Sequence, residues 1–513
     1  MKNHYMITTP IYYVNGLPHI GHAYTSIAAD VLARFKRLDG YDVFFLTGTD
    51  EHGQKVEQAA HNNEQTSEVF VNEISAKFRN MADQLNISYN DFIRTTEERH
   101  KRSCQTLWKK IADAGHIYLG AYEGWYSLRD ECYYSEDELT TTADGQKIAP
   151  TGAQVKWLKE PSYFFRLSAW QDKLLEFYEL HPEFIGPESR KNEMLSFVKS
   201  GLRDLSISRT SFKWGIPVPG DKDHVMYVWF DALTNYISAL GYPDTELSDR
   251  WRFWPADLHL VGKEIARFHA LYWPAFLMAA GLEVPRRIFS HGWWTVEGEK
   301  MSKSVGNVVE PIELINEFGL DPVRFFLLRE VPFGGDGDYS RQSLINRMNN
   351  ELANDLGNLA QRTLTQITRN CDGILPDTGK RLDVDIQLIA KAKLLPILLR
   401  EQMDRQAFNE SLEDIWKVIR ASNAYIDHQA PWKLKKTDFE RMKTVLRILV
   451  DVLREIATCL QPFMPNSMDK LLTQLGVGKN ERNFSDLEKE IHSGIKLPLP
   501  SPIFPRYTEA EQI

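Results

Sequence analysis

The chain has 513 residues, and 43% of them are hydrophobic, which is enough for several buried cores and for two to four domains. Its 61 lysines and arginines against 70 acidic residues leave a formal net charge of −9. This balance excludes a protein that coats nucleic acid with its whole surface, although a local basic face stays compatible with it. The four cysteines lie far apart with no CxxC motif. Neither a disulfide framework nor a Cys-rich zinc knuckle is therefore predicted, and a reducing cytoplasm is expected.

No membrane segment or export signal is predicted. The first residues lack the charged and then apolar pattern of a signal peptide. The most apolar stretches, around 265–282 and 445–464, are interrupted by charged residues or histidine at helical intervals. Such stretches are typical of amphipathic core helices.

The first hundred residues begin with a strand–helix–strand pattern. Residues 5–9 are β-branched and apolar and predict a strand, and residues 43–46 predict a second one. Between them, apolar residues repeat at helical spacing from Gly21 to Leu38, and Gly40 is a stop signal. A strand–helix–strand unit of this kind predicts a parallel sheet.

The tetrapeptide His19-Ile20-Gly21-His22 stands where the first loop enters the helix. A helix N-terminus offers unpaired N–H groups and a partial positive charge, which suit a phosphate. Gly21 lets the backbone approach such a ligand, and the two imidazoles add hydrogen-bond donors. The alternative, a pair of metal-binding histidines, is weaker because no third ligand has a matching spacing.

The second strand leads into residues 47–53, Thr-Gly-Thr-Asp-Glu-His-Gly. This places Asp50 at the carboxyl end of the sheet, where open α/β folds bind their ligands. An acid at that point can hold a ligand ammonium group. Two alternatives stay open: a cation site made by Asp50, Glu51 and His52, and a plain core role for Tyr12 and Tyr13.

A second α/β segment precedes a lysine-rich loop. Residues 258–262 and 287–292 predict strands, and a helix is expected from Lys263 to about Ala280. The sequence Lys300-Met301-Ser302-Lys303-Ser304 follows, with Gly298 and Gly306 as hinge candidates. Such a cationic loop can neutralise charge that develops on a departing pyrophosphate. A basic loop taken alone is as often merely solvated.

Together these motifs resemble the class I aminoacyl-tRNA synthetases, and specifically the methionyl-tRNA synthetase family. Residues 19–22 and 300–304 match the two class signatures without substitution, and segments 9–16, 47–53 and 227–233 are closest to the methionyl branch. The resemblance covers nearly the whole chain. It implies an α/β Rossmann-type (HUP-like) catalytic domain with a parallel sheet, split by a connective insertion and followed by an all-α helix-bundle anticodon-binding domain.

The resemblance also implies a reaction and its residues. Methionine would be activated with ATP to methionyl-adenylate and pyrophosphate, and then transferred to the 3′-terminal adenosine of tRNA(Met), the initiator included. ATP would act as its Mg²⁺ complex, with no dedicated protein site for the metal. The implied methionine-binding residues are Ile11, Tyr13, Asp50, Trp229, Ala232, Leu233, Tyr236, Ile265 and His269. The implied ATP-binding residues are His19, Gly21, His22, Glu264 and Lys303, and the implied catalytic residues are His19, His22, Lys300 and Lys303.

Five regions follow from the same resemblance. They are 1–115, the first half of the catalytic domain; 116–225, the acceptor-stem insertion; 226–300, the second catalytic half; 301–345, the lysine-loop and stem-contact region; and 346–513, the anticodon-binding domain with an extended tail. Relatives often carry zinc knuckles of paired cysteines in the insertion, but this one has only Cys132. We therefore expect no structural zinc, with packed aromatic residues guiding the acceptor stem instead.

The C-terminal part shows helical periodicity from about residue 321 to 475. Asn358 and Arg362 are four residues apart and share a helix face, and Pro431-Trp432 precedes a run of lysines. Hydrogen-bonding groups, an aromatic plate and cations are what recognition of unstacked RNA bases requires. Without the resemblance, another interpretation fits these residues better than RNA recognition does. In that interpretation Trp432 is a core residue and the lysines form a solvated face. The resemblance implies that Asn358, Arg362, Pro431 and Trp432 read the anticodon, in a monomeric protein.

Three rival hypotheses remain at this stage. A sister class I synthetase would share both signatures, although a cysteinyl enzyme would need zinc-ligating cysteines. A stand-alone nucleotidyltransferase would explain residues 1–310 but not the helical region. A catalytically inactive paralogue that binds tRNA belongs to a different class, and the intact His19, His22, Asp50 and Lys303 argue against it.

Overall fold

The computed structural model describes residues 3–142, 144–300 and 307–508, except for the side chains of Tyr122 and Lys300. The chain divides into two compact units. We call residues His4–Pro18 and Phe44–His291 the sheet unit, and the rest, which is Asn3, His19–Val43 and the chain from Gly292 onward, the helix unit. The chain passes between the units after Asn3, Pro18, Val43 and His291.

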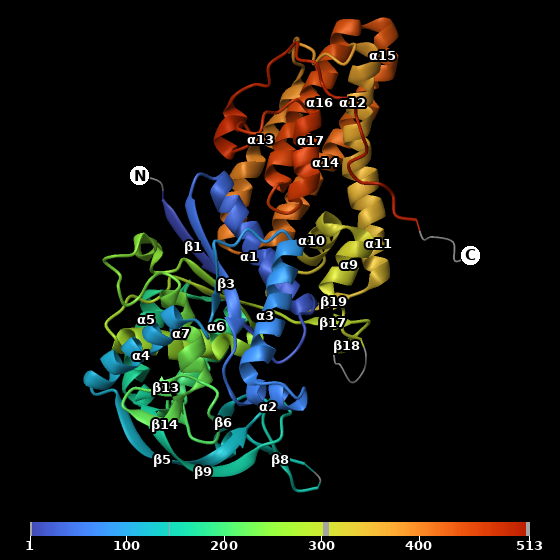
Figure 1. Ribbon diagram of the computed structural model, residues 1–513. Helices are drawn as coiled ribbons and strands as arrows, with labels where there is room; N and C mark the ends of the chain where they lie inside the picture. The colour runs from blue at the N-terminus through green and yellow to red at the C-terminus, as the bar shows by residue number, and fades with distance from the viewer. Residues whose placement is uncertain (1–2, 143, 301–306, 509–513) are drawn as a thin grey trace. The chain divides into compact units, whose positions relative to one another are not determined.

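A seven-stranded sheet is the centre of the sheet unit. Its order is β10-β16-β15-β1-β3-β2, with β4 paired to β3. Strands β1 and β3 of this sheet are labelled in Figure 1. The strands are β1 (His4–Thr8), β2 (Tyr12–Tyr13), β3 (Asp42–Asp50, which begins in the helix unit), β4 (Asp91–Arg94), β10 (Ile185–Gly186), β15 (Leu258–Gly262) and β16 (Ile288–His291). Strand pairs β1–β15, β15–β16, β10–β16, β2–β3 and β3–β4 are parallel, which confirms the predicted sheet. Apolar runs such as Val43–Leu46 suit strands that are buried on both faces.

Helices in this unit follow the strands. They are α2 (Gln54–Asn62), α3 (Ser67–Gln84), α4 (Glu98–Asp113), α7 (Val228–Ser238) and α8 (Trp273–Ala279). The helix predicted from Lys263 to Ala280 is interrupted. A short 3₁₀ turn, η4 (Lys263–Ile265), precedes a π-helical segment, η5 (Phe268–Tyr272), and only then does α8 begin. Hydrophobic periodicity predicts a helix here but does not locate the π-helical turn, because that turn spans only five residues of the apolar stretch.

The insertion between the two halves of the sheet has its own β-structure. Strands β5 (Ile117–Ser127), β6 (Cys132–Tyr134), β9 (Lys156–Phe165) and β11 (Leu205–Ser206) form an antiparallel sheet in the order β11-β9-β5-β6. The long strands β5 and β9 curve side by side (Figure 1). Smaller elements complete it: β7 (Thr140–Thr141), β8 (Lys147–Ile148), α5 (Gln171–Leu180), α6 (Glu188–Lys199), β12 (Ser208–Arg209), β13 (Pro217–Val218) and β14 (Asp221–Met226).

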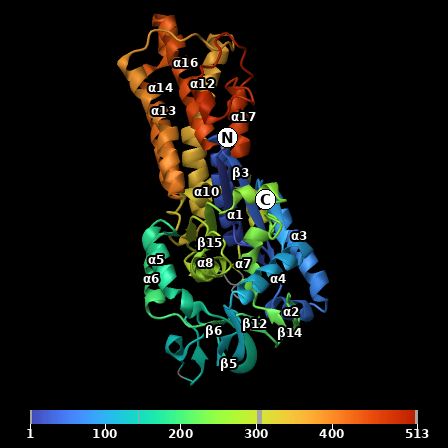
Figure 2. The ribbon, with the colours of Figure 1, turned by 90° about the vertical axis from the view of Figure 1, so that its left-hand side faces the viewer.

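The helix unit contains a bundle in which α13, α14 and α16 run beside one another (Figure 2). The elements of the whole helix unit are α1 (Ile20–Leu38), β17 (Trp294–Val296), β18 (Glu299–Lys300), α9 (Pro311–Phe318), α10 (Leu320–Arg329), β19 (Gly337–Tyr339), α11 (Arg341–Arg347), η6 (a π-helical segment, Met348–Gly357), α12 (Asn358–Asn370), α13 (Asp383–Asp404), α14 (Phe408–Gln429), α15 (Pro431–Thr437), α16 (Phe439–Leu460) and α17 (Pro465–Gln474). Almost every residue of α16 from Thr444 to Leu460 is buried, which confirms a core helix there, although this segment is buried all round and not on one face only, as predicted for an amphipathic helix.

Helix α1 is held in the helix unit by a buried ion pair. The guanidinium of Arg324 on α10 donates to the Asp30 carboxylate on α1 at 2.6 Å, and both side chains are fully buried. Arg324 also donates to the carbonyls of Pro462 and Phe463 at 2.8 and 3.0 Å. The group thus keeps its charge inside the core because each polar atom has a partner.

One local sequence prediction was wrong by one residue. Thr437 and Glu440 suggest a capping box for the next helix. In the structure the N-cap of α16 is Asp438, whose carboxylate accepts from the Arg441 backbone N–H at 2.9 Å. Thr437 instead ends α15. Of the helices described, none combines the length and the apolar character that crossing a membrane would require.

Candidate active site

Asp50 is the last residue of the central strand β3 and is almost completely buried, with 6% of its surface exposed. It pairs in register with Tyr13 of β2. Its Oδ1 atom has no hydrogen-bond partner among the described residues. A buried carboxylate oxygen without a partner is costly, so it points to a cation or donor that binds there.

Three further buried carboxylates lie near Asp50, and each has partners of its own. Glu51 accepts from Arg94 at 2.7 and 3.0 Å, Glu131 accepts from the Tyr13 hydroxyl at 2.7 Å, and Asp231 accepts from two histidines. Burial, followed by the charges of Asp231, Glu131 and Glu51, raises the pKa of Asp50 well above its usual range. The surroundings of Asp50 therefore favour a positively charged ligand group beside it.

The predicted methionine-pocket residues all belong to the sheet unit, and several are in contact. The Tyr236 hydroxyl and His269 Nε2 are 2.7 Å apart, and His269 Nδ1 lies 3.0 Å from the Ile265 carbonyl. Because a carbonyl can only accept, Nδ1 carries the proton and Nε2 accepts from the tyrosine. Burial lowers the pKa of His269 to about 4, so the ring is neutral at pH 7.

Aromatic rings form the wall of this region. Trp229 stacks on Phe268 with ring centroids 3.8 Å apart, and its ring lies 6.0 Å from that of His269. Ala232, Leu233 and Tyr236 are buried on the same helix, α7. Ile11, Tyr13, Trp229 and Ile265 are partly buried against one hydrophobic cluster that contains Leu233 and Tyr236. The set thus combines apolar and aromatic surface with polar groups that are hydrogen-bonded to one another.

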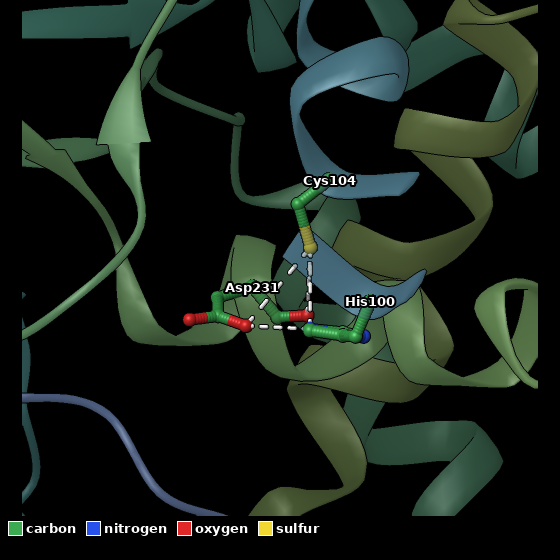
Figure 3. Close-up of side chains that lie close together, drawn as sticks. All are labelled: His100, Cys104 and Asp231. Atoms are coloured by element: carbon green, nitrogen blue, oxygen red, sulfur yellow. Dashed lines mark hydrogen bonds and ion pairs between the residues drawn. The ribbon is translucent and has the colours of Figure 1, made fainter. Parts of the chain in front are cut away.

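Asp231 is the centre of a buried network that the sequence did not reveal (Figure 3). Its two oxygens lie 2.7 Å from His52 Nδ1 and 2.7 Å from His100 Nε2. Cys104 Sγ lies 3.2 Å from His100 Nε2, one turn further along α4. Ionic attraction and hydrogen bonds from both histidines lower the pKa of Asp231 to about 2 against the opposing effect of burial.

In the part of the chain that the structure describes, His100, Cys104 and Asp231 are the one group of three side chains placed closely enough to share a metal ion. Their spacing fits a hydrogen-bonded cluster better. Ligand atoms at 2.0–2.3 Å around a tetrahedral ion lie about 3.3 Å or more apart. The nitrogen and oxygen here are only 2.7 Å apart. His52 lies in the segment 47–53 and Asp231 in the segment 227–233, both of which the sequence singled out. Nothing in either segment indicates that the two residues are in contact.

The tetrapeptide of residues 19–22 forms the start of α1 in the helix unit. His19 is the N-cap, and its Nδ1 accepts from the Gly21 backbone N–H at 3.1 Å. His22 Nδ1 accepts from the His19 backbone N–H, also at 3.1 Å. With Nδ1 used as an acceptor, each neutral ring carries its proton on Nε2. Desolvation and the neighbouring His19 lower the pKa of His22 well below its usual value, so this ring stays neutral.

Gly21 is required by this geometry. A Cβ atom at position 21 would come within 2.9 Å of the His19 ring. The Ile20 backbone N–H donates to the Val309 carbonyl at 3.1 Å, which joins the start of α1 to the segment that follows the lysine-rich loop. Lys300 pairs with Thr295 in the β17–β18 hairpin. Lys303 lies outside the described residues.

Glu264 belongs to the sheet unit, in η4 directly after β15, and its side chain is exposed. Its carboxylate lies over Gly262, where a Cβ would come within 2.5–2.6 Å of both oxygens. Because Gly262 has no side chain, the Glu264 carboxylate can occupy this position at the carboxyl end of the sheet.

In the insertion, aromatic rings pack around the side chain of one arginine, Arg209. The buried guanidinium of Arg209 lies 4.7 Å from the ring of Tyr227, 4.9 Å from Tyr133 and 5.4 Å from Tyr126. It also donates to the Ser208 carbonyl at 2.7 Å. Such cation–π contacts stabilise a desolvated arginine. Cys132 is a free thiol here, and burial raises its pKa to about 11.

The four predicted anticodon residues lie on two neighbouring helices of the helix unit, α12 and α15. The guanidinium of Arg362 on α12 is 5.3 Å from the ring of Trp432 on α15, and it forms an ion pair with Asp427. Asn358 is exposed one turn before Arg362. Pro431 is buried at the first position of α15. Trp432 is 39% exposed, so the alternative that it is a core residue is wrong.

Comparison with known families gives two matches that together span the chain. The family described as "tRNA synthetases class I (M)" matches residues 5–364, and the "anticodon binding domain of methionyl tRNA ligase" matches residues 375–513. The methionine–tRNA ligase of Rickettsia felis is 56% identical, with 99% of both chains covered. That of Brucella suis is 54% identical over 100% of this chain and 99% of the relative.

Solved structures show the same likeness. A Mycobacterium tuberculosis methionyl-tRNA synthetase in complex with methionyl-adenylate has a TM-score of 0.96 and 50% identity, with 99% of this chain and 100% of the other covered. The free state of the M. tuberculosis enzyme has a TM-score of 0.90 and 47% identity, with 99% of each chain covered. With both signatures, the parallel sheet and the helical bundle in place, this chain belongs to the methionyl-tRNA synthetase family of class I aminoacyl-tRNA ligases.

Proposed function

We propose that this chain activates L-methionine with ATP and transfers it to the 3′-terminal adenosine of tRNA(Met). The observation that carries the proposal is the buried Asp50 Oδ1, which has no partner in the described part of the chain. The charges of three other carboxylates act on Asp50, and the same unit contains a cluster of aromatic side chains. A buried carboxylate and an aromatic cluster suit the two ends of methionine.

In this proposal Asp50 binds the α-ammonium group. Ile11, Tyr13, Trp229, Ala232, Leu233, Tyr236, Ile265 and His269 form the pocket for the side chain. Sulfur–aromatic contacts are favourable by roughly 0.3–1.5 kcal/mol, so a thioether gains from stacked rings such as Trp229 and Phe268. The neutral His269, with both nitrogens engaged, presents no charge to the thioether.

We assign the ATP end to residues that suit a polyanion. The N-terminus of α1, with Gly21 and the Nε2–H groups of His19 and His22, would hold the phosphates. Lys300 and Lys303 would neutralise charge on the departing pyrophosphate, and Glu264 would contact ATP. Mg²⁺ would bind to the triphosphate and help to neutralise it. The methionine carboxylate would attack the α-phosphate, and no covalent enzyme intermediate is needed.

For tRNA we propose that Asn358, Arg362, Pro431 and Trp432 read the CAU anticodon. The half-exposed Trp432 ring and the adjacent Arg362 suit base stacking and edge recognition. We assign residues 116–225 to the acceptor stem and 346–513 to the anticodon stem. We further propose a cytoplasmic monomer without structural zinc; the four free thiols are compatible with a reducing compartment.

The experiment that tests this is ATP–pyrophosphate exchange with each of the twenty amino acids, on wild type and Lys303→Ala. Methionine-only exchange that falls by about 10²–10³ in the variant would support both the substrate and the lysine loop. Exchange with another amino acid would indicate a sister synthetase. No exchange with intact tRNA binding would indicate a tRNA-binding module.

A further inference from the structure

A side chain of the insertion reaches a residue of the proposed methionine pocket. The Tyr13 hydroxyl donates to Glu131 Oε1 at 2.7 Å, across 118 positions of sequence. Glu131 is only 6% exposed. The Lys55 ammonium lies 3.6 Å from the other carboxylate oxygen and 5.0 Å from the centre of the Tyr13 ring. Tyr13, Lys55 and Glu131 therefore form one group of ring, cation and anion, in which the carboxylate is buried and the other two side chains are partly buried.

The backbone at Glu131 is unusual. Its φ is +49°, in the left-handed region, at the turn between β5 and β6. A non-glycine residue there costs about 1 kcal/mol or more, and such costs persist where the surroundings require the conformation. The turn thus combines backbone strain with a buried charge. A left-handed residue often closes a hairpin loop, but a buried carboxylate is not needed to close one.

The loop that carries Asp50 leaves room for this contact. Gly53, with φ +105°, has no side chain, and a Cβ there would lie 2.7 Å from the Tyr13 hydroxyl and 3.1 Å from Glu131 Oε1. The Lys55 backbone N–H also points to Glu131 Oε1, at 3.4 Å. The segment from Asp50 to Lys55, strand β2 and the insertion therefore meet at one carboxylate.

We propose that Glu131 is a positioning residue of the methionine pocket, which acts by holding the Tyr13 ring in the orientation that packs against the amino-acid substrate. This inference rests on the proposed function, since it assumes that Tyr13 contacts methionine. Glu131 does not touch the reacting atoms. It makes the amino-acid pocket depend on the insertion, the region that we assign to the acceptor stem.

The test is a double-mutant cycle of Glu131→Gln and Tyr13→Phe in the full chain. Methionine KM, ATP KM and kcat are measured by pyrophosphate exchange, and Tm by calorimetry. Each single variant is expected to raise the methionine KM about tenfold, the size of one buried hydrogen bond, and to leave the ATP KM within about twofold. The double variant should be no worse than the poorer single one, because both changes act on the same contact: Gln removes the charge of the acceptor, and Phe removes the donor hydroxyl.

Glu123→Gln is the matched control. Glu123 is an exposed glutamate on β5 of the same insertion, paired with Lys159 at 3.0 Å, and its loss should leave both KM values unchanged. Additive effects, equal rises in both KM values, or an unchanged methionine KM in Tyr13→Phe would overturn the inference. If Glu131→Gln does not fold, the methionine KM and the ATP KM of Tyr13→Phe test the inference on their own. Absence of methionine exchange in the wild type would instead overturn the proposed function.

Discussion

The region around Asp50, proposed to bind methionine, and the face around Trp432, proposed to bind the anticodon, differ in how far their polar and aromatic side chains are exposed. Near Asp50, polar side chains are buried and hydrogen-bonded to one another, as in the pairs Tyr236–His269 and Asp231–His52. On the other face, Trp432 is 39% exposed and Asn358 is exposed. A small ligand needs rigid, preformed walls, whereas unstacked bases bring their own surface to an open plate.

The two regions nevertheless share one backbone feature. A π-helical segment, η5, contains His269 in the sheet unit, and another, η6, ends directly before Asn358 in the helix unit. Segments of this kind occur often at functional sites because they shift side chains out of the regular helical register. In each region one predicted recognition residue, His269 or Asn358, lies in or directly after such a segment.

The largest effect is expected from Asp50→Asn, which removes the charge proposed to bind the ammonium group. Loss of one partner of a buried charged pair costs several kcal/mol, so kcat/KM for methionine should fall by about 10³. Pyrophosphate exchange measures this, and tRNA binding by filter retention should stay unchanged. A fall in tRNA affinity of similar size would show that the two regions are not independent.

Asp231→Asn should weaken the sheet unit. The amide offers one acceptor where the carboxylate offers two, so a buried imidazole loses its partner and the free energy of unfolding should fall by about 3 kcal/mol. Urea denaturation measures the change, with the exposed Asp223→Asn as control. A zinc content near one per chain in the purified wild type would contradict the hydrogen-bonded description of this cluster.

Trp432→Ala should weaken tRNA(Met) binding by about 1–3 kcal/mol, the contribution of one stacked base. Methionine exchange and Tm should hardly change, because the ring is partly exposed. Phe439→Ala is a suitable control, since Phe439 is 44% exposed on the neighbouring helix α16. Equal losses in the two variants would argue against a specific role for Trp432.

The smallest effect is a pH dependence of methionine binding. The raised pKa of Asp50 means that the free protein takes up a proton at this site as the pH falls, and the proton must leave before an ammonium can bind. Methionine KM should therefore rise on acidification, by at most about tenfold per pH unit, while tRNA binding shows no matching change. A methionine KM that falls on acidification would contradict this sign.

Local sequence patterns predicted much of the fold. Strand β15 was predicted with its observed bounds, and the strands around 5–9 and 287–292 and the helix from Gly21 are present with shifts of about one residue. The strand predicted at 43–46 is longer than expected, because β3 continues to Asp50. Hydrophobic period and helix-end signals act over a few residues, so they can be read from the chain. The roles of the individual site residues remain predictions, and Lys303 lies outside the described residues.

By itself, then, the sequence determined the family, through two signatures and the segments around them, together with the order of strands and helices. Only the tertiary structure decided which buried groups meet. It brings His52 and His100 to Asp231, seats Tyr13 against Glu131, and inserts a π-helical turn at Phe268–Tyr272. The reason is physical: the three hydrogen bonds join residues more than a hundred positions apart, so they form only when the sheet unit has folded and brought these segments together.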